Sequence, residues 1–112
     1  MNPPDLTKTA WKLPALRDRN IFCANAFDDQ AEWYVEAKKR PFQWIVGNPP
    51  WKDLKSGQID EADRPAWDWM AANKKSSPVG GNQLAEAFAW RSTVVLDKDG
   101  SAALMLPART LF

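Results

Sequence analysis

The run FQWIVG at residues 42–47 constrains the fold of this chain most, because residues that break regular structure close it on both sides. Pro41 precedes the run, and the sequence GNPP ends it. A run this short between breakers is too brief for an ordinary helix and is typical of a buried strand. The sequence therefore predicts a short strand at 42–47 that leaves directly into a rigid turn.

Two further short apolar runs alternate with helical patterns along the chain. NIFCANAF (20–27) and SAALMLP (101–107) end in turn or breaker residues, so each is predicted to be a strand. Asp29 and Glu32 have the spacing of a capping box and are expected to begin a helix between the first two strands. A longer helix is expected from residue 82 to Gly100, where the glycine ends it.

This order of elements predicts an α/β fold, since strands separated by helices form right-handed crossovers in a parallel sheet. We expect a single partial domain with a parallel sheet of about three strands and flanking helices. Its parts are expected to be an irregular lead-in (1–19), a strand–helix–strand unit (20–51), a long loop with a short helix from Pro65 (52–81), and a helix and strand (82–112). Such a thin sheet predicts that the chain is cut from a larger domain and that its open strand edge favours self-association.

The composition argues against several classes of site. The chain of 112 residues has no histidine and one cysteine, Cys23, which argues against His/Cys metal sites and His-assisted nucleophiles. A net charge of +1 gives no global signature of nucleic-acid binding, so a polyanion would need a local basic patch. A single cysteine fits a reducing compartment, and no stretch approaches the ~20 apolar residues of a membrane span. We therefore expect a cytoplasmic protein with no metal site and no membrane contact.

The sequence NPPW at residues 48–51 combines stiffness with hydrogen-bond acceptors. Pro49 and Pro50 have no N–H and fixed φ angles, so the loop is rigid, and the Asn48 oxygen and nearby carbonyls remain free to accept. Two convergent acceptors suit an –NH2 group, and Trp51 can stack on the flat ring that carries it, worth ~1–3 kcal/mol per base. Ligands of parallel sheets lie beyond the carboxyl ends of the strands, where this loop is predicted. The alternative is a rigid turn with Trp51 packed in the core.

IVGNPPW resembles the motif of class I S-adenosylmethionine-dependent amino-methyltransferases, in which Asp, Asn or Ser precedes two prolines and an aromatic residue. The resemblance is greatest to the N6-adenine DNA methyltransferases of restriction–modification systems. NIFCANAFDD is similar to the strand and turn before that motif, and residues 81–112 are similar to the helix, turn and strand after it. The resemblance implies a partial Rossmann-like methyltransferase fold and methyl transfer from S-adenosylmethionine to the N6 amine of a flipped adenine.

The resemblance assigns a catalytic role to the four motif residues, Asn48, Pro49, Pro50 and Trp51. It implies that Asn48 Oδ1 and the Pro49 carbonyl accept hydrogen bonds from the N6 amine while Trp51 holds the adenine ring. Such a mechanism depends on positioning and on preorganised dipoles, and it requires no general base. That agrees with a chain that lacks histidine.

The resemblance also suggests residues that contact the cofactor and the DNA. Asn25 and Ala26 match the cofactor edge, although the family often has Asp where Asn25 stands, and a turn asparagine is the alternative. Asn82 falls where the family has a residue near the active site, and a helix N-cap is the alternative. Lys52 and Lys55 follow the motif and are candidates for phosphate contacts, although acidic residues alternate with them and a mixed solvated surface is the alternative.

Parts of the family pattern are missing from the sequence. Residues 1–19 contain no glycine, so the glycine-rich turn and the acidic residue that normally hold S-adenosylmethionine are absent. We therefore expect the chain alone to be inactive and to need residues outside it for the cofactor. The expected partners are double-stranded DNA and a restriction or specificity subunit or domain. The alternatives are a methyltransferase for RNA base amines or protein glutamine, and a non-catalytic interaction module.

Overall fold

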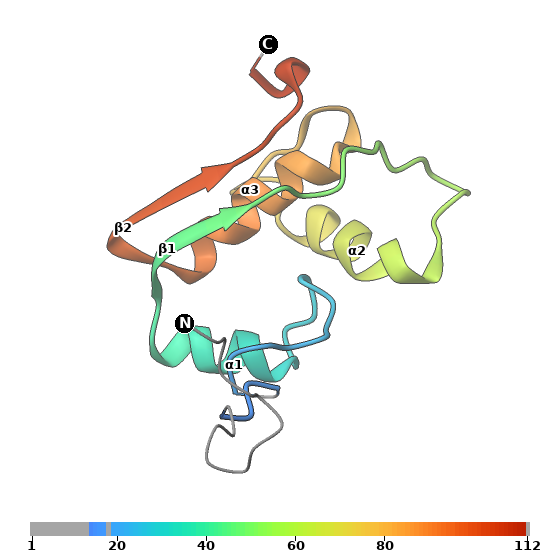
Figure 1. The fold of residues 1–112 in the computed structure, drawn as a ribbon. Helices are drawn as coiled ribbons and strands as arrows, with labels where there is room; N and C mark the ends of the chain where they lie inside the picture. The colour runs from blue at the N-terminus through green and yellow to red at the C-terminus, as the bar shows by residue number, and fades with distance from the viewer. Residues whose placement is uncertain (1–13, 18, 112) are drawn as a thin grey trace, which may run out of the picture.

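The computed structural model describes residues 14–17 and 19–111, with the side chain of residue 111 left out, so most of the expected lead-in lies outside the described residues. The regular elements are α1 (Glu32–Lys39), β1 (Phe42–Gly47), α2 (Arg64–Ala72), α3 (Leu84–Val95) and β2 (Leu96–Leu104), as Figure 1 shows. Short 3₁₀ turns lie at Glu61–Asp63, Gly80–Asn82 and Ala108–Leu111.

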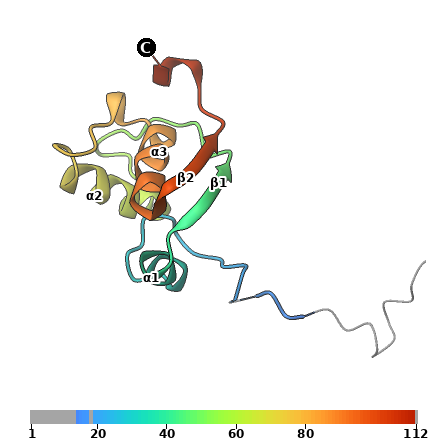
Figure 2. The same ribbon diagram turned by 90° about the vertical axis from the view of Figure 1, so that its left-hand side faces the viewer.

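β1 and β2 lie side by side and run parallel (Figure 1). The regular pairing runs from Trp44 opposite Ser101 to Gly47 opposite Leu104. The helices α2 and α3 lie on one side of this sheet, and α3 is the nearer of the two (Figure 2). The expected α/β class and the parallel pairing are therefore confirmed, with a sheet of two strands among the described residues.

The strand expected at 20–27 is wrong. Ile21 makes an isolated bridge with Arg17, and the following residues form turns. Asn25 Oδ1 accepts a hydrogen bond from the Phe27 N–H at 2.9 Å, and the Asp28 N–H donates to the Asn25 carbonyl at 3.2 Å. These short-range bonds satisfy backbone groups that a strand would have offered to a neighbour.

The capping box expected at Asp29 and Glu32 is also wrong. α1 begins at Glu32 and has Ala31 at its N-cap, where no side chain caps the helix. Asp29 turns instead toward Arg91 of α3, with 2.7 Å between its Oδ1 and the Arg91 Nη2. The end of α1 at Lys39, just before Pro41, agrees with the sequence.

The helix α3 ends at Val95, earlier than the expected end at Gly100. Leu96 is already extended, with ψ 137°, and pairs with Phe42 at the start of β2. Gly100 lies inside β2, where a Cβ would come within 2.9 Å of the Phe42 carbonyl oxygen. The glycine thus allows a close approach of two strands and does not end a helix.

The hydrophobic core lies between the helices and the loop after β1, and it leaves the sheet largely bare. Its buried members are Phe27, Leu54, Ala66, Trp69, Met70, Leu84 and Ala87. In β1, by contrast, Trp44 is 74% exposed and Val46 is 75% exposed. α2 begins within one residue of Pro65, so the short helix expected inside the long loop is confirmed. No helix among the described residues is long and apolar enough to cross a membrane.

Candidate functional site at the NPPW loop

The NPPW loop leaves β1 at the carboxyl edge of the sheet, beside the segment that follows β2. The Met105 N–H donates to the Gly47 carbonyl at 3.0 Å, which continues the strand pairing by one bond. The loop turns away at this point because Pro49 and Pro50 have no N–H with which to extend the ladder. The loop therefore lies at the edge of the sheet where ligands of parallel sheets bind.

The loop presents two acceptors that no other described residue uses. The Asn48 side chain is exposed, and neither its oxygen nor the Pro49 carbonyl accepts a hydrogen bond within residues 14–17 and 19–111. The ring of Pro49 is buried, which anchors the backbone between the two oxygens. The Pro49 carbonyl belongs to the stiff backbone and the Asn48 oxygen to the side chain beside it, and two such acceptors suit a ligand with two N–H bonds.

A hydrogen bond at the edge of the Trp51 indole holds the ring in place. Its Nε1–H donates to the carbonyl of Met105 at 3.0 Å, and 54% of the residue remains exposed. The alternative of a buried core tryptophan is therefore wrong. With the N–H already used, the side chain offers a ring face for stacking and no free donor.

Asn25 and Ala26 lie close to the NPPW loop in space. Together with Pro50, they line a cavity of about 110 Å³. Asn25 Nδ2 donates to the Ala62 carbonyl at 2.8 Å, while its Oδ1 accepts the Phe27 N–H and keeps a second lone pair. Asn25 is thus a turn residue that also borders this cavity.

Arg91 holds the turn that contains Ala26, and sequence reasoning missed it. Its side chain is 4% exposed, and its Nε donates to the Ala26 carbonyl at 2.8 Å. Its Nη2 lies within ion-pair distance of Asp29, although the angle does not suit a hydrogen bond. The sequence does contain a signal for Arg91, because it lies at helical spacing from Leu84 and Ala87 and so shares their buried face of α3. A charged residue at such a position indicates a buried polar contact.

Asn82 is not a helix N-cap, and the structure does not bring it to the cavity beside Pro50. Gln83 occupies the N-cap position of α3, while Asn82 has a φ of 54°. The left-handed backbone turns its carbonyl toward Leu54, whose N–H donates to it at 3.0 Å. Asn82 lines a separate cavity of about 270 Å³ beside Trp67.

Lys52 and Lys55 differ in how far their charges are already paired. Lys52 forms an ion pair with Asp63, and its Nζ lies 3.9 Å from Asp60. The hydrogen bond that Lys52 donates to Asp63 raises the pKa of Lys52 above its ordinary value of 10.5. Lys55 is exposed and forms no ion pair with another described residue.

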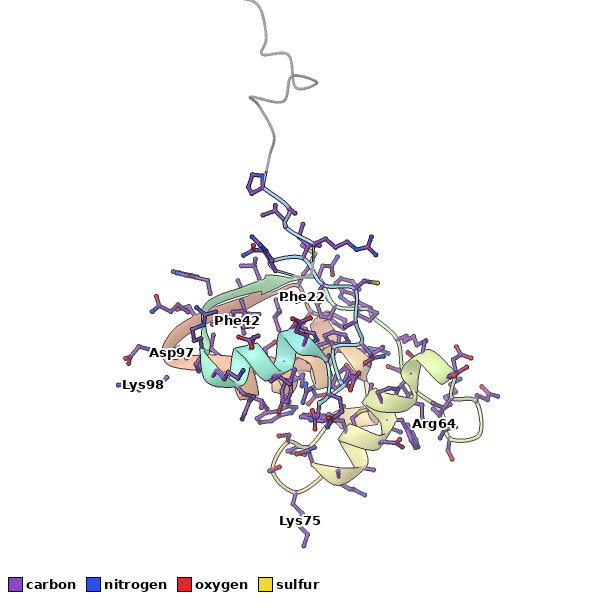
Figure 3. All side chains as sticks on the ribbon, turned by 90° about the horizontal axis from the view of Figure 1, so that it is seen from below. Phe22, Phe42, Arg64, Lys75, Asp97 and Lys98 are labelled. Carbon is purple, nitrogen blue, oxygen red and sulfur yellow. The ribbon has the colours of Figure 1, made fainter. Side chains whose placement is uncertain are left out.

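The basic side chains labelled in Figure 3, all from the described part of the chain, lie apart from one another. Arg64 and Lys75 project on the α2 side of the molecule, while Lys98 lies beside Asp97 at the far end of the sheet (Figure 3). Among the residues described, the Lys98 Nζ also lies 3.4 Å from an oxygen of Asp99.

Comparison with known proteins gives a family for the chain. No curated protein and no solved structure matches it. The family model described as "Eco57I restriction-modification methylase" matches residues 5–112, which is nearly the whole sequence. That match includes β1, the NPPW loop and β2, the elements that build the site. The chain therefore belongs to the Eco57I restriction–modification methylase family.

Proposed function

We propose that this chain carries the target-amine half of a DNA methyltransferase that modifies the N6 amine of adenine. The observation that carries the proposal is the pair of free acceptors, Asn48 Oδ1 and the Pro49 carbonyl, next to the exposed face of Trp51. The family match supports methyl transfer to DNA, and the acceptors favour an amine as the group that is modified.

The proposed mechanism needs the adenine outside the duplex, at a cost of a few kcal/mol. Trp51 stacks on the flipped ring and offsets part of that cost, with ~1–3 kcal/mol expected for one stacked base. Asn48 and Pro49 each accept one N–H of the N6 amine. Both bonds strengthen as the nitrogen becomes tetrahedral, so they favour the transition state over the planar ground state.

S-adenosylmethionine supplies the electrophilic methyl group when it is bound. The residues present fit one end of this cofactor, because the cavity beside Asn25 and Pro50 has mostly apolar walls and two polar residues that can accept a hydrogen bond, Asn25 and Asp63. Those features suit the edge of an adenine ring. The ribose and methionine need donors that a glycine-rich turn normally supplies, and residues 1–19 have no glycine. Asn25 and Ala26 are therefore proposed as the adenine edge of the cofactor site.

The DNA contacts proposed for this chain are weaker than the amine contacts. Lys55 is the better candidate for a phosphate because it forms no ion pair within residues 14–17 and 19–111, whereas Lys52 must first leave Asp63. Asn82 is proposed to support the segment after the NPPW loop, because its carbonyl accepts a hydrogen bond from the Leu54 N–H. A restriction or specificity subunit remains a proposed partner, and a cytoplasmic location is proposed as well.

The decisive experiment follows radiolabelled methyl transfer onto mixed-sequence duplex DNA, using a native form of the protein that includes a glycine-rich turn. Asn48→Ala is expected to lower the rate by about a hundredfold or more, because one of two preorganised acceptors is lost. Asn20→Ala is the matched control, since Asn20 is exposed and lies with Phe42 near the start of β1, at the opposite end of the strand from the loop. Label on RNA or on protein glutamine, with none on DNA, would overturn the DNA assignment.

A further inference from the structure

Asp53 and Arg109 form a two-pronged ion pair across the site. Arg109 Nη1 donates to Asp53 Oδ2 at 3.0 Å, and Nη2 donates to Asp53 Oδ1 at 2.6 Å. The two residues are 56 positions apart and lie in the segments that follow β1 and β2. A planar guanidinium that meets both oxygens of a carboxylate fixes the angle between the groups as well as their distance.

The ion pair of Asp53 and Arg109 is expected to contribute little to the free energy of unfolding. The side chains of Arg109 and Asp53 are 52% and 37% exposed, so solvent screens their attraction. Their location is more informative than their energy. Asp53 lies two residues after Trp51, and Arg109 lies four residues after Met105, the acceptor of the Trp51 indole N–H.

The segment between Met105 and Arg109 is stiff enough to transmit the constraint. Pro107 fixes one φ angle, and the Thr110 N–H donates to the Pro107 carbonyl at 2.9 Å to close a 3₁₀ turn. Thr110 also donates its hydroxyl to Gln83 Oε1 at 3.1 Å. The position of the Met105 carbonyl is thus linked to the position of Arg109.

The residues after Trp51 are also held by hydrogen bonds to the segment that begins α3. The Leu84 N–H donates to the Lys52 carbonyl at 2.8 Å, and the Leu54 N–H donates to the Asn82 carbonyl at 3.0 Å. Asp53 pairs with Gln83 between these two bonds in an antiparallel bridge. The backbone of Asp53 is therefore fixed, and its side chain holds Arg109 in place from the opposite segment.

We propose that Asp53 and Arg109 are a positioning pair that keeps the indole of Trp51 against the Met105 carbonyl and so sets the plane in which the NPPW loop receives a flat ring. The role in orienting an adenine rests on the proposed function. The control of the Trp51 indole does not, because it concerns contacts within this chain. Neither residue touches the reacting atoms.

The test measures hydrogen exchange of the Trp51 indole N–H by NMR in the 112-residue chain, with the signal assigned through its loss in Trp51→Phe. Arg109→Ala and Asp53→Asn are each expected to speed this exchange by about tenfold. Arg109→Lys should give an intermediate rate because an ammonium cannot form the fork. The exchanged pair, Asp53→Arg with Arg109→Asp, should restore slow exchange.

Lys98→Ala is the matched control, since it breaks an exposed ion pair that does not contact the loop. Unchanged exchange in both single variants, or equal loosening in Lys98→Ala, would overturn the proposal. In an active native form, Arg109→Lys is expected to lower kcat by about tenfold, with little change in KM for S-adenosylmethionine. If the native form with a glycine-rich turn and no substitution transfers no methyl group to DNA, the proposed function fails, whereas the indole exchange measured in the 112-residue chain still decides the positioning pair.

Discussion

The guanidinium of Arg91 lies over the ring of Tyr34, with 4.0 Å between Cζ and the ring centroid. The same side chain reaches the Ala26 carbonyl and Asp29, so one residue of α3 joins α1 to the turn beside the NPPW loop. The stacked guanidinium is almost fully buried, where a cation over an aromatic face is worth ~2 kcal/mol or more.

Arg91→Ala is expected to lower the free energy of unfolding by about 2–4 kcal/mol, because it removes the stacking on Tyr34 and leaves the Ala26 carbonyl without its donor. Urea denaturation followed by circular dichroism measures the loss. Arg64→Ala, at an exposed position on α2, should change stability by less than about 0.5 kcal/mol. Equal effects of the two substitutions would show that Arg91 does not join these elements.

Gly100→Ala is expected to destabilise the sheet by about 1–3 kcal/mol, since the added methyl group meets backbone atoms that cannot rotate away. The new Cβ would lie 2.9 Å from the Phe42 carbonyl oxygen and 3.0 Å from that of Asp97. Gly47→Ala is the control, because its Cβ would meet only Leu104 Cδ2 at an ordinary 3.7 Å. Thermal unfolding of both variants should place Gly100→Ala well below Gly47→Ala.

The pair of Lys52 and Asp63 predicts a stability difference that depends on pH. Asp63 raises the pKa of Lys52 above 10.5, so the folded state holds this proton more tightly than the unfolded state does. The resulting stabilisation is fully present below pH 10.5 and disappears as pH rises through the folded pKa. Melting temperatures of the unmodified chain and Lys52→Met should therefore differ at pH 8 and converge only in strong alkali. A difference that changes between pH 5 and pH 8 would contradict this assignment.

The exposed apolar face and open edge of β1 predict that the chain self-associates. β1 contains no charged residue, and among the residues that the structure describes it pairs with β2 alone. Val46→Lys places a charge beside the open edge and is expected to shift the chain toward monomer in sedimentation velocity. Val35→Lys on α1 changes an exposed valine elsewhere and should leave association unchanged. If the chain without substitutions sediments as a monomer at all concentrations, the open edge of β1 is not a contact surface.

The sequence predicted the elements that depend on local signals. Pro41 and the prolines after Asn48 bound β1 correctly, and Pro65 marked the start of α2 within one residue. The parallel pairing of β1 with the strand after α3 also followed from the alternation of strands and helices. The element boundaries are decided by residues close to one another in the chain, whereas the pairing of β1 with β2 follows from the order of the elements.

Two of the errors occurred where a distant partner decides the structure. Asp29 has the spacing of a capping residue, but Arg91 draws it away from the start of α1. Gly100 has the position of a helix end, but the approach of Phe42 requires it inside β2. In the site, the motif residues were predicted and their anchors were not, because Met105 and Arg109 carry no local signal of that role.

The indole bond between Trp51 and Met105 means that the four letters NPPW do not by themselves encode the shape of the loop. A chain that ended at Leu104 would retain the motif and the strand before it, and it would lose the carbonyl that orients the tryptophan. Grafting the tetrapeptide onto another strand would likewise transfer the acceptors without the Met105 carbonyl that holds the Trp51 indole. The transferable unit is a strand pair together with both of its exit segments, so a transplant of this site must include Met105 and, with the positioning role proposed for its pair with Asp53, Arg109 as well.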